Sequence, residues 1–169
     1  MNNKQCEIFL AYHRPSEILK DEVFTPIHVG REVSFKKNKD GQLSEESVNW
    51  LKKNLIGDNT GDNISCKNPY YCELTAQYWA WKNCNADYIG FMHYRRHLSF
   101  DDTVAYKENI YGLVDSAILN ADYVNKFKLD SEHISKMVSQ YDIVTVKPWN
   151  VTQAGSKNNY DHYLSLIHI

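Results

Sequence analysis

The sequence has no long apolar run and no excess of charge of one sign. None of its apolar runs approaches the ~20 residues that a membrane-spanning helix needs, and its first residues are polar, unlike a secretion signal. Nineteen basic and 21 acidic side chains give a formal charge of −2, whereas a protein that grips a nucleic-acid backbone usually has a strongly basic surface. These absences predict a cytoplasmic protein and argue against a nucleic-acid partner.

Several motifs of enzymes and metal sites are also missing. The four cysteines form no Cys-x-x-Cys pair, and no histidines follow at zinc-finger spacing, so neither a structural zinc site nor a disulfide framework is predicted. Gly-x-Ser-x-Gly, Gly-x-Gly-x-x-Gly and His-Glu-x-x-His do not occur. Serine hydrolases, dehydrogenases and zinc proteases therefore lack the residues on which their chemistry depends.

What remains is the composition of one globular domain, with 43% apolar residues but only seven glycines and four prolines. Strands are predicted at residues 7–12, 25–30, 86–92 and 141–146, with the third in a central position. Helices are predicted from about Ser44, over residues 68–83 and after Asp130. Because strands and helices alternate, we expect an α/β fold with a mainly parallel sheet flanked by helices.

For two of these helices the sequence also predicts which face is buried or whether the helix is peripheral. In the helix at residues 68–83, Asn68 can cap the amino end and Pro69 fits the first turn without losing a hydrogen bond. Its apolar stripe, which we expect to face the core, consists of Tyr71, Leu74, Tyr78 and Trp81. The helix that begins near Ser44 is expected to be peripheral.

Charged and aromatic side chains gather where the predicted strands end. In open α/β sheets, ligands bind outside the carboxyl ends of the strands. The strand ends concerned are Tyr12-His13, Gly30-Arg31 and His93-Tyr94-Arg95-Arg96. Two adjacent arginines can fork onto the oxygens of a diphosphate, and we expect them to emerge from a middle strand and to lie near the loop at residues 57–65. Pairing with surface carboxylates is the alternative for the arginines, and a packed imidazole is the alternative for His93.

A polar loop and one helix face offer further groups to a ligand. Residues 56–65 combine two glycines with short polar side chains, a composition typical of a tight loop, and their spacing matches neither a P-loop nor an EF-hand. A purely structural loop is the alternative. On the predicted helix, Glu73 and Gln77 lie one turn apart, and if their face lines a cleft, Trp79 offers a surface for stacking. A solvated helix face is the alternative.

Residues 26–31, 56–65, 68–83 and 86–96 together resemble an uncharacterised-domain family of bacterial capsule, exopolysaccharide and lipopolysaccharide glycosyltransferases. The resemblance covers residues 6–163 and is most specific between residues 56 and 96. It implies a GT-A-like, Rossmann-related fold, with a nucleotide-sugar-binding domain at residues 1–163. Since family members usually continue further, it also implies that the domain is incomplete at its C-terminal end. Residues 164–169 show no helix cap, turn or partner strand, and we expect them to be a non-native tail.

The resemblance also implies a reaction and a site. It suggests transfer of a sugar from a nucleotide-sugar donor, with a UDP sugar expected, to a surface-polysaccharide or lipid-linked acceptor, with peripheral contact at the inner face of the cytoplasmic membrane. Glu73 and His93 would be the catalytic residues. The residues that would bind the nucleotide sugar are Tyr12, His13, Gly30, Arg31, Asp58, Thr60, Gly61, Asp62, Asn63, Tyr70, Trp79, Tyr94, Arg95 and Arg96.

The chain departs from the GT-A pattern at the metal site. Many GT-A enzymes hold Mn²⁺ or Mg²⁺ with an Asp-x-Asp motif, and the corresponding residues here are His93-Tyr94-Arg95. Arginines could neutralise the donor diphosphate in place of a metal, so no metal ligand is assigned and metal dependence stays open. Two other functions also stay open: a non-catalytic module that binds nucleotide sugars or carbohydrate, and binding of single-stranded RNA by aromatic rings and the two arginines.

Overall fold

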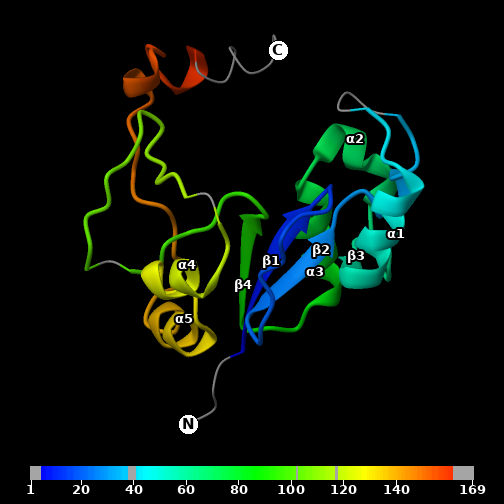
Figure 1. Cartoon of the computed structure of the whole chain (residues 1–169), viewed down its shortest axis with the longest axis horizontal. Helices are drawn as coiled ribbons and strands as arrows, with labels where there is room; N and C mark the ends of the chain where they lie inside the picture. Colours follow the sequence, from blue (N-terminus) through cyan, green and yellow to red (C-terminus); the bar gives the residue numbers. More distant parts are fainter. Residues whose placement is uncertain (1–4, 38–40, 102, 117, 162–169) are drawn as a thin grey trace.

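The computed structural model describes residues 5–37, 41–101, 103–116 and 118–161. Its sheet has four strands in the order β3-β2-β1-β4, and every neighbouring pair is parallel (Figure 1). The strands are β1 (Cys6–Tyr12), β2 (Phe24–His28), β3 (Ile56–Gly57) and β4 (Tyr88–His93). The helices are α1 (Glu45–Asn54), α2 (Asn68–Tyr71), α3 (Leu74–Asn83), α4 (Ala121–Lys126) and α5 (Ser131–Val138), with short 3-10 turns at Arg31–Val33, Ser65–Lys67 and Val151–Ala154.

The predicted α/β class, with a mainly parallel sheet and flanking helices, is confirmed. None of the helices in the described part of the chain is long and apolar enough to cross a membrane. The expected tail at residues 164–169 lies outside the described residues.

Strand β1 supplies the centre of the molecule because it is bonded on both sides and buries both of its faces. Its alternating side chains point to opposite sides of the sheet. Ile8 and Leu10 join an apolar cluster that includes Leu51 of α1 and Ile134 of α5. Phe9, on the opposite face, belongs to a second cluster that α3 covers. The helix begins directly after Ser44 as predicted, and the side chain of Ser44 caps it, but it is not peripheral because Leu51 is fully buried.

Helix α3 turns a different face to the sheet from the one predicted. Its buried residues include Ala76 and Ala80, which are 1% and 0% exposed. The predicted stripe faces solvent instead, with Leu74 51% and Trp81 69% exposed. Small alanines let the helix backbone come close to the strands, and this gain in packing outweighs the burial of larger side chains. Periodicity alone does not say which face of a helix meets the core.

The remaining differences concern helix continuity and strand positions. The helix predicted over residues 68–83 is two helices, because Cys72 adopts φ 49° and ψ −127° between α2 and α3. Strand β4 lies at an edge of the described sheet rather than at its centre. Residues 141–146 form no strand, whereas the helix after Asp130 is confirmed as α5. Helix α4 was not predicted, although Asn120 caps it through its side chain.

Candidate functional site

A cluster of imidazole, carboxylate and guanidinium groups lies at the carboxyl ends of β1 and β4. These strands are adjacent and parallel, with Ala11 opposite His93 in the register. The rings of His13 and His93 therefore come within 5.8 Å of each other, centre to centre. The α2–α3 junction brings Glu73 to the same place, where its Oε1 lies 4.0 Å from Nε2 of His93. Residues 13, 73 and 93 meet here although up to 80 positions separate them in the chain.

The two arginines follow β4 in a tight turn. The backbone N–H of Arg96 donates to the carbonyl of His93 at 2.9 Å, which closes the turn. Tyr94 points inward, is 8% exposed and stacks on Tyr12 with ring centres 5.1 Å apart. Arg95 and Arg96 are exposed, and neither guanidinium forms an ion pair with a carboxylate among the residues that the structure describes. The alternative that surface carboxylates neutralise these arginines therefore finds no support in the described residues.

His93 is held in one orientation and kept neutral. The backbone N–H of Arg95 donates to its Nδ1 at 3.2 Å, so the proton of the neutral ring sits on Nε2, the nitrogen that faces Glu73. Burial lowers the pKa of His93 to about 4; Glu73 opposes this shift, and Arg95, His13 and Arg96 add to it. At neutral pH, His93 is therefore a hydrogen-bond donor beside an acceptor carboxylate, with two guanidinium groups close by.

A hollow of about 440 Å³ lies beside this cluster, at the carboxyl end of β1. Residues that follow β1 line one side, and the amino end of α1 lines the other. Its lining is His13, Arg14, Pro15, Gly41, Gln42, Leu43, Ser44 and Ser47. Polar groups and an arginine thus surround a space at the sheet edge where α/β folds bind ligands.

The loop at residues 57–65 is organised from within by Asp58. This carboxylate is fully buried and accepts hydrogen bonds from the backbone N–H groups of Gly30 and Arg31, at 2.7 and 3.1 Å. It also accepts from the hydroxyls of Ser65 and Thr75, at 2.5 and 2.7 Å. With four donors filling both oxygens, the carboxylate of Asp58 ties together three segments and is not available to a ligand.

Further polar groups of this loop are bonded to helix α3 or to one another. The indole N–H of Trp79 donates to the carbonyl oxygen and the hydroxyl of Thr60, both at 2.9 Å. The hydroxyl of Tyr78 donates to the carboxylate of Asp62 at 3.1 Å. Asn63 donates to the carbonyl of Gly61. These predicted ligand-binding residues therefore support one another, and the structural alternative describes most of the loop.

Arg31 and Gly30 also have structural roles. The guanidinium of Arg31 donates to the carbonyls of Leu51, Leu55 and Ile56, at 3.2, 2.8 and 3.0 Å, which are the last carbonyls of α1 and the start of β3. Gly30 has φ 66°, a conformation that side-chain-bearing residues rarely adopt. Arg31 thus holds the end of α1. Its place at a strand end had predicted that it binds a ligand instead.

His28 is a residue that the sequence analysis missed. It is 1% exposed, and its Nδ1 accepts a hydrogen bond from Nε of Arg31 at 3.3 Å. Burial, with smaller contributions from Arg31, Lys52 and His13, lowers its pKa to about 3. A neutral His28 therefore orients Arg31. The predicted strand at residues 25–30 contains His28, but strand periodicity does not show that its imidazole pairs with Arg31.

The arginine turn follows β4 and the 57–65 loop begins at β3, and these two strands lie at opposite edges of the described sheet. The order β3-β2-β1-β4 puts two strands between them, a separation of about 14 Å at ~4.8 Å per strand. The expectation that the arginines emerge from a middle strand is therefore wrong, because they follow an edge strand of the described sheet. The structure brings together His13, Glu73, His93, Arg95 and Arg96, while Tyr70 lies on α2 and is 85% exposed.

The side chains at the end of β4 do not suit a divalent cation. Where GT-A enzymes carry Asp-x-Asp, the accessible groups are an imidazole and a guanidinium, and a second guanidinium follows. Within the described ranges, no three His, Cys, Asp or Glu side chains are placed to hold a metal ion. Two fixed positive charges would repel Mn²⁺ or Mg²⁺, whereas they favour the phosphates that such a metal would bind.

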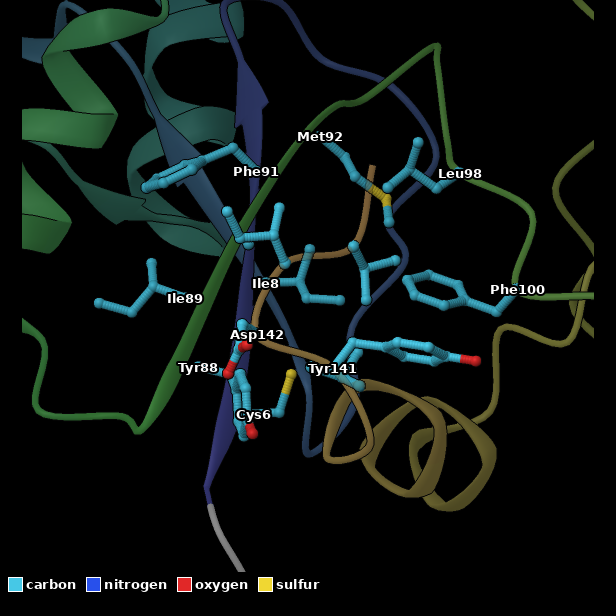
Figure 2. A pocket seen from close by; sticks show the side chains of 14 residues that line it. Cys6, Ile8, Tyr88, Ile89, Phe91, Met92, Leu98, Phe100, Tyr141 and Asp142 are labelled. Atoms are coloured by element: carbon cyan, nitrogen blue, oxygen red, sulfur yellow. The ribbon is translucent and has the colours of Figure 1, made fainter. Parts of the chain in front are cut away.

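A second hollow, of about 340 Å³, lies against β4 and is mainly apolar (Figure 2). In Figure 2, Met92 and Leu98 point toward each other at one end, Cys6 lies at the other end, and Phe100 and Tyr141 lie between them. These side chains offer few partners to a phosphate or a sugar hydroxyl. This apolar hollow is thus poorly suited to a nucleotide sugar.

Comparison with known proteins identifies a family and a related structure. The family DUF4422, described as a domain of unknown function, matches residues 7–169. The chain belongs to the DUF4422 family. A solved structure described as the apo form of WbbM, a bifunctional glycosyltransferase, is 44% identical, with a TM-score of 0.76. That similarity covers 94% of this chain but 25% of the WbbM chain. No curated protein matches. The DUF4422 fold seen here is thus shared with part of a glycosyltransferase, in agreement with the predicted resemblance.

Proposed function

We propose that this DUF4422 chain binds the donor of a glycosyltransferase reaction, in which a sugar moves from a nucleotide sugar to a surface-polysaccharide or lipid-linked acceptor. The observation that carries this proposal is the cluster at the carboxyl ends of β1 and β4, where Glu73, His93, Arg95 and Arg96 lie together. The similarity to part of WbbM supports the same reaction class.

Each group of the cluster has a chemical role in this proposal. The guanidinium groups of Arg95 and Arg96 bind the donor diphosphate and stabilise the charge that develops on it as the sugar leaves. The Nε2–H of neutral His93 donates to a phosphate or sugar oxygen, and the carboxylate of Glu73 accepts from a sugar hydroxyl. The 4.0 Å between His93 and Glu73 is too long for a hydrogen bond and leaves each free to bind the donor. No residue is assigned as the general base.

Because guanidinium groups take the place of metal ligands, we propose that donor binding needs no divalent cation. A lipid-linked acceptor would place the reaction at the inner face of the cytoplasmic membrane. UDP is the first ligand to test, since we expect a UDP sugar as donor.

Calorimetric titration of the full chain with UDP tests the arginines. Arg95→Gln and Arg96→Gln should each weaken UDP binding about 10- to 100-fold, because each removes a charge-assisted contact worth ~1.5–3 kcal/mol. Lys53→Gln, which removes an exposed cation from α1, should leave the affinity unchanged. Binding that is equally strong in the arginine variants, or that disappears in a chelator and returns with Mn²⁺, would contradict the proposed site.

Transfer of a labelled sugar from its UDP donor separates the enzyme from the alternative of a binding module. UDP binding together with product formation supports the enzyme. UDP binding without hydrolysis or transfer would assign the chain to the non-catalytic alternative.

A further inference from the structure

The solvent face of α3 carries an aromatic surface that begins at the candidate site. Glu73, Gln77 and Trp81 follow one another at intervals of four residues and so form a single row along the helix. Glu73 lies beside His93, and Trp81 is 69% exposed two turns further on. Leu74 and Tyr78 flank this row. We call the surface formed by Glu73, Leu74, Gln77, Tyr78, Trp81 and Lys82 the α3 platform.

The aromatic part of the α3 platform is held in place before any ligand arrives. Tyr78 packs edge-on against Trp81, with ring centres 5.6 Å apart and planes at 85°. Its hydroxyl is bonded to Asp62 of the 57–65 loop, which fixes the ring. The ammonium of Lys82 lies 3.6 Å from the centre of the Trp81 ring. Exposed rings that are held in this way bind a ligand at a low cost in conformational entropy.

The groups of the α3 platform match a neutral, hydroxyl-rich ligand. Aromatic faces attract the C–H groups on the apolar side of a sugar ring. A carboxylate and an amide lie beside the rings, and the ammonium of Lys82 lies over one face of Trp81; these groups accept from and donate to hydroxyls. Since charges of both signs are present, the platform lacks the one-sided basic character that favours an anionic membrane.

The size of the α3 platform also favours a small ligand over a protein. Its exposed apolar area is on the order of 300 Å², since Leu74 is 51% and Trp81 69% exposed and a whole tryptophan has ~250 Å². A stable protein interface needs ~800 Å² from each partner. From Leu74 to Trp81 the helix rises by about 10 Å, roughly the length of two linked sugar rings.

We propose that the α3 platform binds the acceptor glycan of the reaction, with the sugars distant from the reacting end stacked on Trp81. This rests on the proposed function, because the site beside Glu73 is taken as the place of transfer. The row from Glu73 to Trp81 then leads the acceptor away from the donor diphosphate.

Binding of linear glucose, galactose and mannose oligosaccharides of two to four units to the full chain tests this platform. Tryptophan fluorescence and saturation-transfer NMR are the readouts. At least one series should bind saturably, and Trp81→Ala should weaken it about tenfold or more. Trp81→Tyr, which keeps a ring, should restore part of the affinity. Tyr160→Ala, which removes a tyrosine that is 68% exposed elsewhere, should have no effect.

Three results would overturn this inference: no oligosaccharide series binds, the Trp81→Ala variant binds as well as the parent chain, or Trp81 is instead needed for self-association or for flotation with phosphatidylglycerol vesicles. A UDP titration keeps the two proposals apart. If Trp81→Ala binds UDP normally while glycan binding is unaffected, the platform is refuted and the donor site stands. If glycans bind through Trp81 but UDP does not bind at all, the donor site is refuted.

Discussion

At the scale of single residues, Asp58 and Arg31 act mainly as hydrogen-bond partners of other protein groups. Asp58 and Arg31 were both predicted to bind a ligand, yet each is occupied by protein donors or acceptors. The buried carboxylate accepts four hydrogen bonds, and the guanidinium donates to three carbonyls. The sequence predicted a tight polar loop at residues 56–65, which holds for residues 58–64, whereas Ile56–Gly57 form the strand β3 that was not predicted. The sequence did not show whether those polar groups face a ligand or one another, because the partners lie up to 28 positions away.

Asp58→Asn tests this structural role. The amide keeps one acceptor oxygen but turns a donor toward groups that are themselves donors, so we expect the free energy of unfolding to fall by about 2–4 kcal/mol. Asp62→Asn in the same loop removes an exposed charge and should cost under about 1 kcal/mol. Urea denaturation of both variants measures the difference. Equal stability of the two variants would mean that the Asp58 network contributes little.

At the scale of elements, two helix starts were predicted correctly, whereas one cap and one helix break were not. Ser44 and Asp130 cap α1 and α5 at the places where the sequence predicted these helices to begin. Asn68, which was expected to cap, is instead the first residue of α2, and the N-cap Lys67 makes no side-chain hydrogen bond. The break at Cys72 was not predicted, because cysteine gives no sign of a positive φ. It separates α2 from α3 and brings Glu73 to His93. A continuous helix would therefore change the geometry of the candidate site.

Glycine substitution tests the strain at this break. Cys72 has φ 49° and ψ −127°, a conformation that glycine tolerates and that costs other residues ~1–3 kcal/mol. Cys72→Gly should raise the free energy of unfolding by up to about 1 kcal/mol, since relief of strain exceeds the entropic cost of glycine. Cys66→Gly, where φ is not positive, should lower it by about 0.5–1 kcal/mol. Thermal unfolding compares them, and a loss of stability in Cys72→Gly would argue against strain there.

At the scale of the whole molecule, the position of the candidate site depends on the central strand β1. It pairs with β2 on one side and β4 on the other, and it delivers His13 beside His93. Helices α1 and α5 join its first face and α3 covers the second. The alternating order of elements was sufficient to predict a parallel sheet. Strand order was not predictable in the same way, because β4 is an edge strand that resembles a central one in sequence.

Hydrogen exchange measured by mass spectrometry tests this hierarchy. Amides of β1 should exchange slowest, because the strand is buried and bonded on both sides. Amides of residues 141–150, which form no helix or strand, should exchange at least about 100-fold faster. Helix α5 serves as an internal reference for a regular element outside the sheet. Protection of residues 141–146 equal to that of β1 would show that the strand predicted there does form.

Local chemistry in the sequence was enough to specify the α/β class, the parallel strands β1, β2 and β4, the starts of α1 and α5, and the charged segment that follows β4. Strand order, the buried face of α3 and the grouping of Glu73 with His13 and His93 came from the tertiary structure alone. The physical reason is that hydrophobic periodicity and capping act within a few residues, whereas packing of alanines on the sheet and pairing of strands join segments that are distant in the chain. The sequence by itself supplies the side chains of the candidate site, whereas the tertiary structure decides how they are placed.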